Sequence, residues 1–177
     1  MAANETLLNA ATLERTLARM AHEIAERNEA DHSLVLLGLQ LGGVSLAQSL
    51  ATRLGTIWSA AVPCGSLDIS LHRDDLDQRV APELHPTSLP GDIAGKTVLL
   101  VDDVLYSGRT VRAAMDALNT FGRPKRIQLA VLVDRGHREL PIQPDFVGTS
   151  IKTSRSQNIV VSHGRNGAED RVYLEEK

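Results

Sequence analysis

The chain has 177 residues, of which 42% are hydrophobic and 3% aromatic. This length suits one α/β domain, because a chain of this size buries roughly 70% of the surface that its unfolded form exposes. The formal net charge of −3 argues against indiscriminate binding of nucleic acid, although it leaves room for a local basic patch.

Cysteine usage and the N-terminal residues predict the compartment. Cys64 is the only cysteine, which rules out an internal disulfide and favours a reducing compartment. The first ten residues lack the basic and apolar regions of a secretory signal, and no apolar stretch is long enough to span a membrane. We therefore expect a cytoplasmic protein without membrane contact.

The first part of the chain alternates between helical and extended patterns. Apolar residues at helical spacing predict a helix over residues 11–28; they are Leu13, Leu17, Met20, Ala21 and Ile24. A continuous apolar run then predicts a buried strand over residues 33–39. A helix is expected over residues 44–54, directly after Gly42-Gly43. Two further strands are predicted over residues 56–63 and 67–71.

Residues 73–95 carry several charges and three prolines without a sustained period. Such a segment is long for a loop in a compact domain, and it favours an active-site lid over a linker. The following elements are a strand over 97–103, a helix over 109–121, a strand over 127–134, and short strands over 146–148 and 159–162. This alternation predicts an α/β fold, with a mostly parallel twisted sheet flanked by helices and ligands at the carboxyl ends of its strands.

The stretch TVLLVDDVLYSGRTV, residues 97–111, has the pattern of a site for a phosphorylated sugar. Its apolar strand ends in Asp102 and Asp103, and a short polar loop then opens a helix. Gly108 lets the backbone approach an anion, while the free N–H groups and dipole of the helix favour a phosphate. The two carboxylates suit ribose hydroxyls or Mg²⁺. A P-loop is disfavoured because Gly-x-x-x-x-Gly-Lys-Ser/Thr does not precede the carboxylates.

Two further blocks accompany this stretch: GSLDISLHRDDL at residues 65–76 and LVDRGHRELP at residues 132–141. Together the three blocks resemble the PyrR family of type I phosphoribosyltransferases, over most of the chain from about Leu13 to about Val161. The resemblance implies a single phosphoribosyltransferase domain over residues 1–177, with a flexible lid at about 73–95 and a small hood at about 135–165.

The resemblance also implies an activity. A PyrR-type protein makes UMP and pyrophosphate from uracil and phosphoribosyl pyrophosphate (PRPP), with Mg²⁺ as cofactor. It also regulates pyrimidine biosynthesis genes through their leader mRNA, and it forms homodimers or homotetramers.

Transferred by position, the resemblance assigns roles to individual residues. The catalytic candidates are Asp102, Asp103 and Arg73, and the first two also address Mg²⁺, partly through the ligand. The PRPP and UMP site comprises Leu99, Leu100, Val101, Asp102, Asp103, Val104, Leu105, Tyr106, Ser107, Gly108, Arg109, Thr110 and Val111. The pyrophosphate loop is Leu41, Gly42 and Gly43, and backbone groups around Ile159 and Val160 read the base.

RNA-binding candidates lie on the first predicted helix. Arg15, Arg19 and His22 fall within an arc of roughly 60° opposite the apolar stripe, and Arg27 lies further round. Such a stripe is also what the solvated face of any amphipathic helix looks like. The resemblance adds His137 and Arg138 as further RNA contacts.

One departure from the family pattern bears on turnover. Relatives commonly carry Thr-Arg-Gly where this chain has Leu41-Gly42-Gly43. The lost charge-assisted contact is worth about 1.5–3 kcal/mol, so Gly42→Arg is expected to raise turnover if the loop keeps the family geometry. This departure favours an alternative function, that of a regulator that senses nucleotide or PRPP with little or no turnover. A purine phosphoribosyltransferase is disfavoured by Tyr106, because some purine-specific relatives place a catalytic aspartate there.

Overall fold

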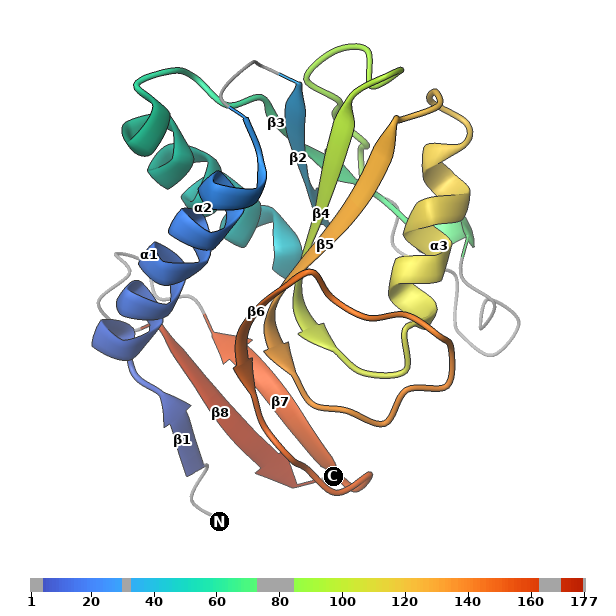
Figure 1. Cartoon of the computed structure of the whole chain (residues 1–177). Helices are drawn as coiled ribbons and strands as arrows, with labels where there is room; N and C mark the ends of the chain where they lie inside the picture. The colour runs from blue at the N-terminus through green and yellow to red at the C-terminus, as the bar shows by residue number, and fades with distance from the viewer. Residues whose placement is uncertain (1–4, 30–32, 73–84, 163–169, 177) are drawn as a thin grey trace.

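The computed structural model describes residues 5–29, 33–72, 85–162 and 170–176, and its centre is a five-stranded parallel sheet (Figure 1). The strands run in the order β3-β2-β4-β5-β6. Their bounds are β2 (Leu34–Leu39), β3 (Cys64–Leu67), β4 (Thr97–Leu105), β5 (Arg126–Asp134) and β6 (Phe146–Ser150). All six residues of β2 are buried, as expected for a parallel strand covered on both faces.

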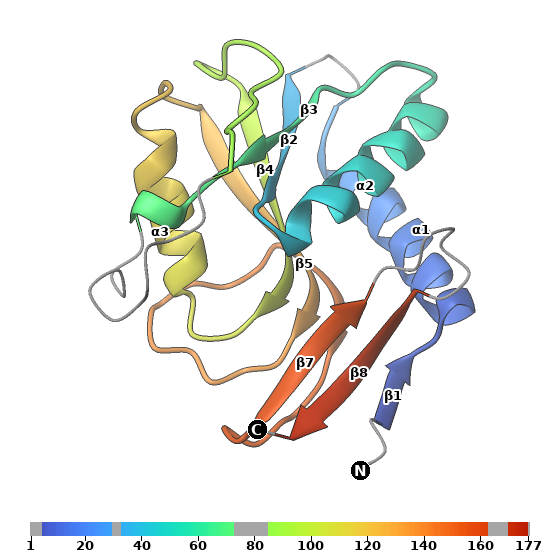
Figure 2. The ribbon, with the colours of Figure 1, turned by 180° about the vertical axis from the view of Figure 1, so that it is seen from behind.

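Helices cover both faces of this sheet. Helices α1 (Ala10–Arg27) and α2 (Gly42–Trp58) pack on one face, and α3 (Arg109–Leu118) packs on the other (Figures 1 and 2). Alternate residues of β4 serve the two layers: Val101 packs with α1 and α2, whereas Leu100 packs with α3. The predicted α/β architecture is therefore confirmed, and so is the helix predicted over residues 11–28.

A second, antiparallel sheet joins both ends of the chain in the order β1-β8-β7. Its strands are β1 (Glu5–Leu8), β7 (Gln157–Ser162) and β8 (Arg171–Glu176). Figure 1 places this small sheet beyond the carboxyl ends of the parallel strands. Only β7 falls within the range predicted for the hood. The other two strands, β1 and β8, are short and lie at opposite ends of the chain, so no local sequence pattern predicts that they pair.

Two predicted strands are wrong. The strand expected over residues 56–63 is instead the end of α2 and the turn after it. The helix continues to Trp58 and is capped by Ser59, which adopts a left-handed conformation (φ 51°) and donates its N–H to Gly55 O. The strand expected over residues 67–71 ends at Leu67, and Ser70–His72 form a 3₁₀ turn. In the first case helix packing overrode the β preference of Thr, Ile and Trp side chains.

The segment predicted as a lid lies partly outside the described residues, which resume at residue 85. Its described end is tied to β3, because Ser66 and Ser88 form an isolated antiparallel bridge. The Asp68 carboxylate accepts hydrogen bonds from Ser70 N (2.9 Å) on one side of the segment and from His85 N (2.9 Å) on the other. In the described part of the chain, no helix is long and apolar enough to cross a membrane.

Candidate active site

The loop that follows β4 builds the cavity expected for a phosphate. Gly108 adopts φ 92°, a left-handed conformation, and α3 begins at the next residue. The first helical bond runs from Arg112 N to Gly108 O (3.0 Å), so the amides of the first turn precede it. A cavity of about 300 Å³ opens here, lined by Asp102, Val104, Leu105, Tyr106, Ser107, Gly108, Arg109, Thr110 and Glu139.

The two adjacent carboxylates point to opposite faces of the sheet, because successive side chains of a strand alternate. Asp102 is 7% exposed and lines the cavity beside the loop. Asp103 lies on the α2 side, where its Oδ1 accepts a bond from Val104 N (2.7 Å). The two carboxylates therefore face two different regions of the molecule.

The predicted pyrophosphate loop lies beside Asp103. A β carbon added to Gly42 would stand 2.1 Å from Asp103 Oδ2, and one added to Gly43 would stand 2.0 Å from Val101 O. Both glycines are thus required for the start of α2 to approach β4 so closely. The side chain of Leu41 is 66% exposed. Gly42→Arg cannot enter this loop without displacing the Asp103 carboxylate, so a simple gain in turnover is no longer expected.

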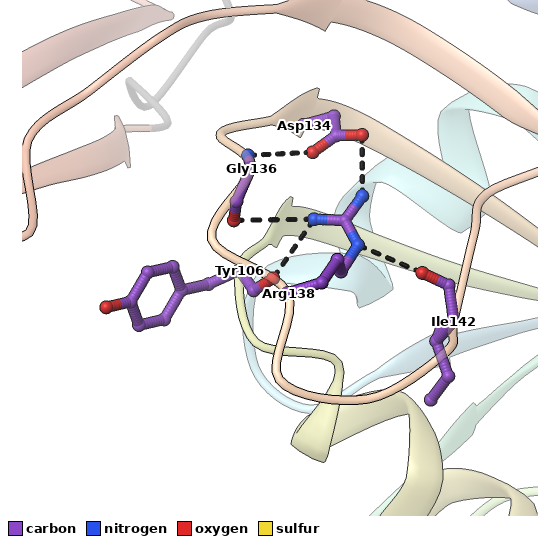
Figure 3. A network of polar contacts seen from close by, with 5 residues as sticks. All are labelled: Tyr106, Asp134, Gly136, Arg138 and Ile142. Carbon is purple, nitrogen blue, oxygen red and sulfur yellow. Dashed lines mark hydrogen bonds and ion pairs between the residues drawn. The ribbon is translucent and has the colours of Figure 1, made fainter.

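Residues 134–142, which we call the bracing segment, pack against the phosphate loop. Arg138 lies at its centre and donates to Tyr106 O (Nη1, 3.0 Å), Ile142 O (Nε, 3.0 Å) and Asp134 Oδ2 (Nη2, 2.6 Å) (Figure 3). Burial opposes ionisation of Asp134, but the hydrogen bonds from Arg138 and Gly136 N, with the Arg138 charge, outweigh it and lower the pKa of Asp134.

The ring of Tyr106 points away from Arg138 (Figure 3). It contacts the side chains of Arg135 and His137 instead. The guanidinium carbon of Arg135 lies 4.3 Å from the ring centroid, and the His137 ring meets it edge-on at 5.8 Å. Arg135 is 6% exposed and also donates to Ser154 O (3.0 Å) and Gln157 O (2.6 Å). Tyr106 is thereby connected to the segment between β6 and β7.

The structure divides the RNA-binding candidates between two regions. Arg15 and His22 are exposed on α1, as predicted. Arg19 pairs with Glu23 (2.6 Å) and donates to Gly148 O, and Arg27 donates to Asp145 O (3.2 Å). These two arginines therefore attach α1 to β6. His137 and Arg138 lie instead in the bracing segment, where His137 Nε2 is 2.7 Å from Thr153 O.

The other predicted site residues fall into three groups. Leu99, Leu100, Val101 and Val111 are at most 3% exposed, so their side chains form core and cannot contact a ligand. Ile159 and Val160 are half-buried in β7 of the small sheet. Arg73 lies outside the described residues.

Two residues emerge only from the structure. Glu139 lines the cavity and pairs with Arg109 Nε at 2.9 Å, and Arg135 stacks on Tyr106. Both belong to the LVDRGHRELP block. Arg135 directly follows the buried strand β5 and Glu139 comes five residues after its end, which was the available signal, but their partners lie in other elements.

Comparison with known proteins identifies the family. A model of the phosphoribosyl transferase domain matches residues 3–165. The chain is 51% identical over 176 residues to "Bifunctional protein PyrR" of Geobacter sp. (strain M21), covering 99% of both chains. It is 53% identical over 170 residues to the protein of that name from Roseiflexus sp. (strain RS-1), covering 95% of this chain and 93% of the relative.

Solved structures agree at the level of the fold. The hypoxanthine phosphoribosyltransferase of Trypanosoma cruzi superposes with a TM-score of 0.71 at 20% identity, covering 99% of this chain and 98% of that one. A hypoxanthine-guanine phosphoribosyltransferase from Bacillus anthracis gives 0.68 at 21% identity, covering 84% of each chain. With the domain match and the relatives of about half identity, these results confirm the predicted resemblance: the chain belongs to the PyrR family of phosphoribosyltransferase-fold proteins.

Proposed function

We propose that this protein is a uracil phosphoribosyltransferase that forms UMP and pyrophosphate from uracil and PRPP and also regulates pyrimidine genes. The observation that carries the proposal is the cavity at the end of β4, where Asp102 meets a glycine-bearing loop and the start of α3. The relatives' shared name, "Bifunctional protein PyrR", agrees with a protein of two activities.

We propose the following ligand contacts. The 5-phosphate is placed against the amides of residues 106–110, where the positive end of α3 favours an anion. The ribose hydroxyls donate to Asp102, which lines the same cavity. Pyrophosphate lies on the other side, near Asp103 and the amides of Leu41, Gly42 and Gly43. The base is read at β7, by backbone groups around Ile159 and Val160.

The donor set fits Mg²⁺. In the described part of the chain, no three His, Cys, Asp or Glu side chains cluster, so an all-protein metal cage is not built there. Mg²⁺ usually binds one or two carboxylates together with substrate phosphates and water. Asp103 would supply a carboxylate beside the pyrophosphate loop, and Asp102, on the opposite face of the sheet, would act on the ion through the bound ligand. The bound ion would neutralise charge on the pyrophosphate.

The reaction is the displacement of pyrophosphate from C1 of the ribose by uracil. The transition state resembles an oxocarbenium ion, so the residues named here act by orienting the ribose and by stabilising the departing charge. Gly42 contributes only backbone donors at the leaving group, and Asp103 occupies the space that a side chain at residue 42 would need. Ground-state binding of PRPP is therefore retained, while turnover is expected to be modest.

Regulation is proposed to act through leader mRNA of pyrimidine genes. Arg15 and His22 are exposed on α1 and are the phosphate contacts that the structure supports best. An Arg15→Gln/His22→Gln variant should bind a labelled leader RNA more weakly than wild type does. Its affinity for UMP should be unchanged. An oligomer and a cytoplasmic location, both expected from the resemblance, belong to this proposal.

A radiolabelled-uracil assay tests the enzymatic proposal directly. Incubation with uracil, PRPP and Mg²⁺ should give labelled UMP, and EDTA should abolish it. Calorimetric titration with UMP provides the parallel binding measurement. Tight UMP binding without any labelled product would instead support a nucleotide-sensing regulator, for which the glycines of the pyrophosphate loop are the favouring feature. Absence of both product and binding would contradict the proposed site.

A further inference from the structure

Three consecutive carbonyls at the end of β4 are bonded by the bracing segment. Leu105 O accepts from Arg135 N (3.1 Å), and Ser107 O accepts from Glu139 N (3.0 Å) and Leu140 N (3.2 Å). Between them, Tyr106 O accepts from a side chain, the Nη1 of Arg138, at 3.0 Å. The middle carbonyl is therefore the one whose bond depends on a particular side chain.

The direction of a carbonyl fixes the direction of the following amide. In a trans peptide the C=O and N–H groups point in opposite directions. Holding Tyr106 O and Ser107 O against the bracing segment consequently turns the amides of Ser107 and Gly108 to the other side of the loop. An anion-binding loop needs N–H groups, and not carbonyl oxygens, to face its ligand.

We infer that Arg138 is a positioning residue, which fixes the Tyr106–Ser107 peptide so that the loop presents amides to the 5-phosphate. This inference rests on the proposed function of the same cavity. The side chain of Arg138 is only 15% exposed, and each of its three nitrogens donates within the protein: Nε to Ile142 O, Nη1 to Tyr106 O and Gly136 O, and Nη2 to Asp134 (Figure 3).

This bonding pattern requires a guanidinium. A lysine ammonium is a single point donor on a flexible stem, so it cannot bridge Tyr106 O, Ile142 O and Asp134 at once. Arg138 also differs from the exposed arginines of α1, because its donors are already bonded to acceptors within the protein. Arg138 thus acts on the ligand through the phosphate loop.

The test compares Arg138→Gln and Arg138→Lys with wild type and with Arg126→Gln. Arg126 is exposed at the opposite end of β5 and serves as the matched control. Affinity for UMP is measured by calorimetry, and KM and kcat are measured for PRPP and for uracil. Circular dichroism and thermal unfolding report the folded fraction of each variant.

The 5-phosphate is bound in both the ground state and the transition state, so its loss changes KM more than kcat. Both Arg138 variants should weaken UMP binding and raise KM for PRPP by a similar factor, roughly ten- to hundredfold. KM for uracil and the values of the control should stay near wild type. A merely structural role would lower kcat with the folded fraction and leave KM for PRPP unchanged.

Other outcomes overturn the inference. Wild-type UMP affinity in a folded Arg138→Gln or Arg138→Lys protein would show that the loop does not depend on this guanidinium. Loss of leader-RNA binding with intact UMP affinity would assign Arg138 to RNA instead. If Arg138→Gln fails to fold, the comparison of Arg138→Lys with Asp134→Asn decides the question. Asp134→Asn leaves the contact between Arg138 and Tyr106 O in place. Arg138→Lys should therefore lose far more UMP affinity than Asp134→Asn. Failure of wild type itself to bind UMP would overturn the proposed function, and this inference with it.

Discussion

Asp103 and Gly42 lie in direct contact: the Asp103 Oδ2 atom occupies a position only 2.1 Å from where a β carbon of Gly42 would be. Residues from β4 and from the start of α2, 61 positions apart in the chain (103 − 42), therefore share one space. The Asp103 carboxylate occupies the space that a side chain at residue 42 would need.

Gly42→Ala is expected to displace the Asp103 carboxylate, because a separation of 2.1 Å is far below van der Waals contact. Affinity for PRPP with Mg²⁺ should fall, whereas UMP, which lacks pyrophosphate, should bind nearly as before. Calorimetry with both ligands measures this difference. Gln48→Ala, at an exposed position of the same helix, is the control. Equal PRPP affinity in Gly42→Ala and wild type would mean that Asp103 does not address this ligand.

Asp102→Asn and Asp103→Asn should behave differently, because their side chains point to opposite faces of the sheet. Asp102 lines the cavity of the phosphate loop, so its amide variant should weaken both UMP and PRPP binding. Asp103 lies beside the pyrophosphate loop, so its variant should weaken PRPP far more than UMP. Titration of each single variant with the two ligands checks this. The same loss pattern in both variants would contradict the division of roles.

Gly108→Val should lose UMP binding and be destabilised by at least about 1–2 kcal/mol, because φ 92° is unfavourable for a residue with a β carbon. The added β carbon would also stand 3.3 Å from Ile142 Cβ in the bracing segment. Chemical denaturation gives the stability and calorimetry gives the affinity.

Gly95→Val is the matched control for backbone strain. Gly95 has φ 72° with nothing within 4 Å of an added β carbon, and it lies outside the residues that line the cavity. It should lose stability and keep UMP affinity. Normal UMP binding by folded Gly108→Val would show that the phosphate lies elsewhere.

The ion pair between Asp134 and Arg138 should make part of the stability pH-dependent. Despite burial, bonds from Arg138 and Gly136 N lower the pKa of Asp134 in the folded protein. Its contribution is present above the unfolded pKa of about 3.9 and is lost as the pH falls through the lower folded value. Asp134→Asn should therefore have a lower Tm than wild type at pH 7, and the difference should shrink as the pH is lowered from about 4 into the more acidic range. A constant difference in Tm across that range would contradict this assignment.

Much of the site was readable from the sequence because its parts are local. The apolar run before Asp102, the glycine at residue 108 and the polar loop between them lie within 15 residues, and their order alone predicts strand, loop and helix. The predicted site also includes Leu99, Leu100 and Val101, whose side chains lie in the core because this strand is buried on both faces. The alternation of a strand also separates Asp102 from Asp103.

The sequence by itself determined four of the five strands of the parallel sheet, the first helix and the loop before α3, since each depends on hydrophobic period or on turn chemistry within one short segment. Tertiary structure alone decided the rest. It paired the two chain ends into a second sheet, placed Asp103 against Gly42, and set Arg138 beneath the Tyr106 carbonyl. These relationships join residues that are distant along the chain, and their energies come from close packing and from satisfying buried polar groups, which no local pattern encodes.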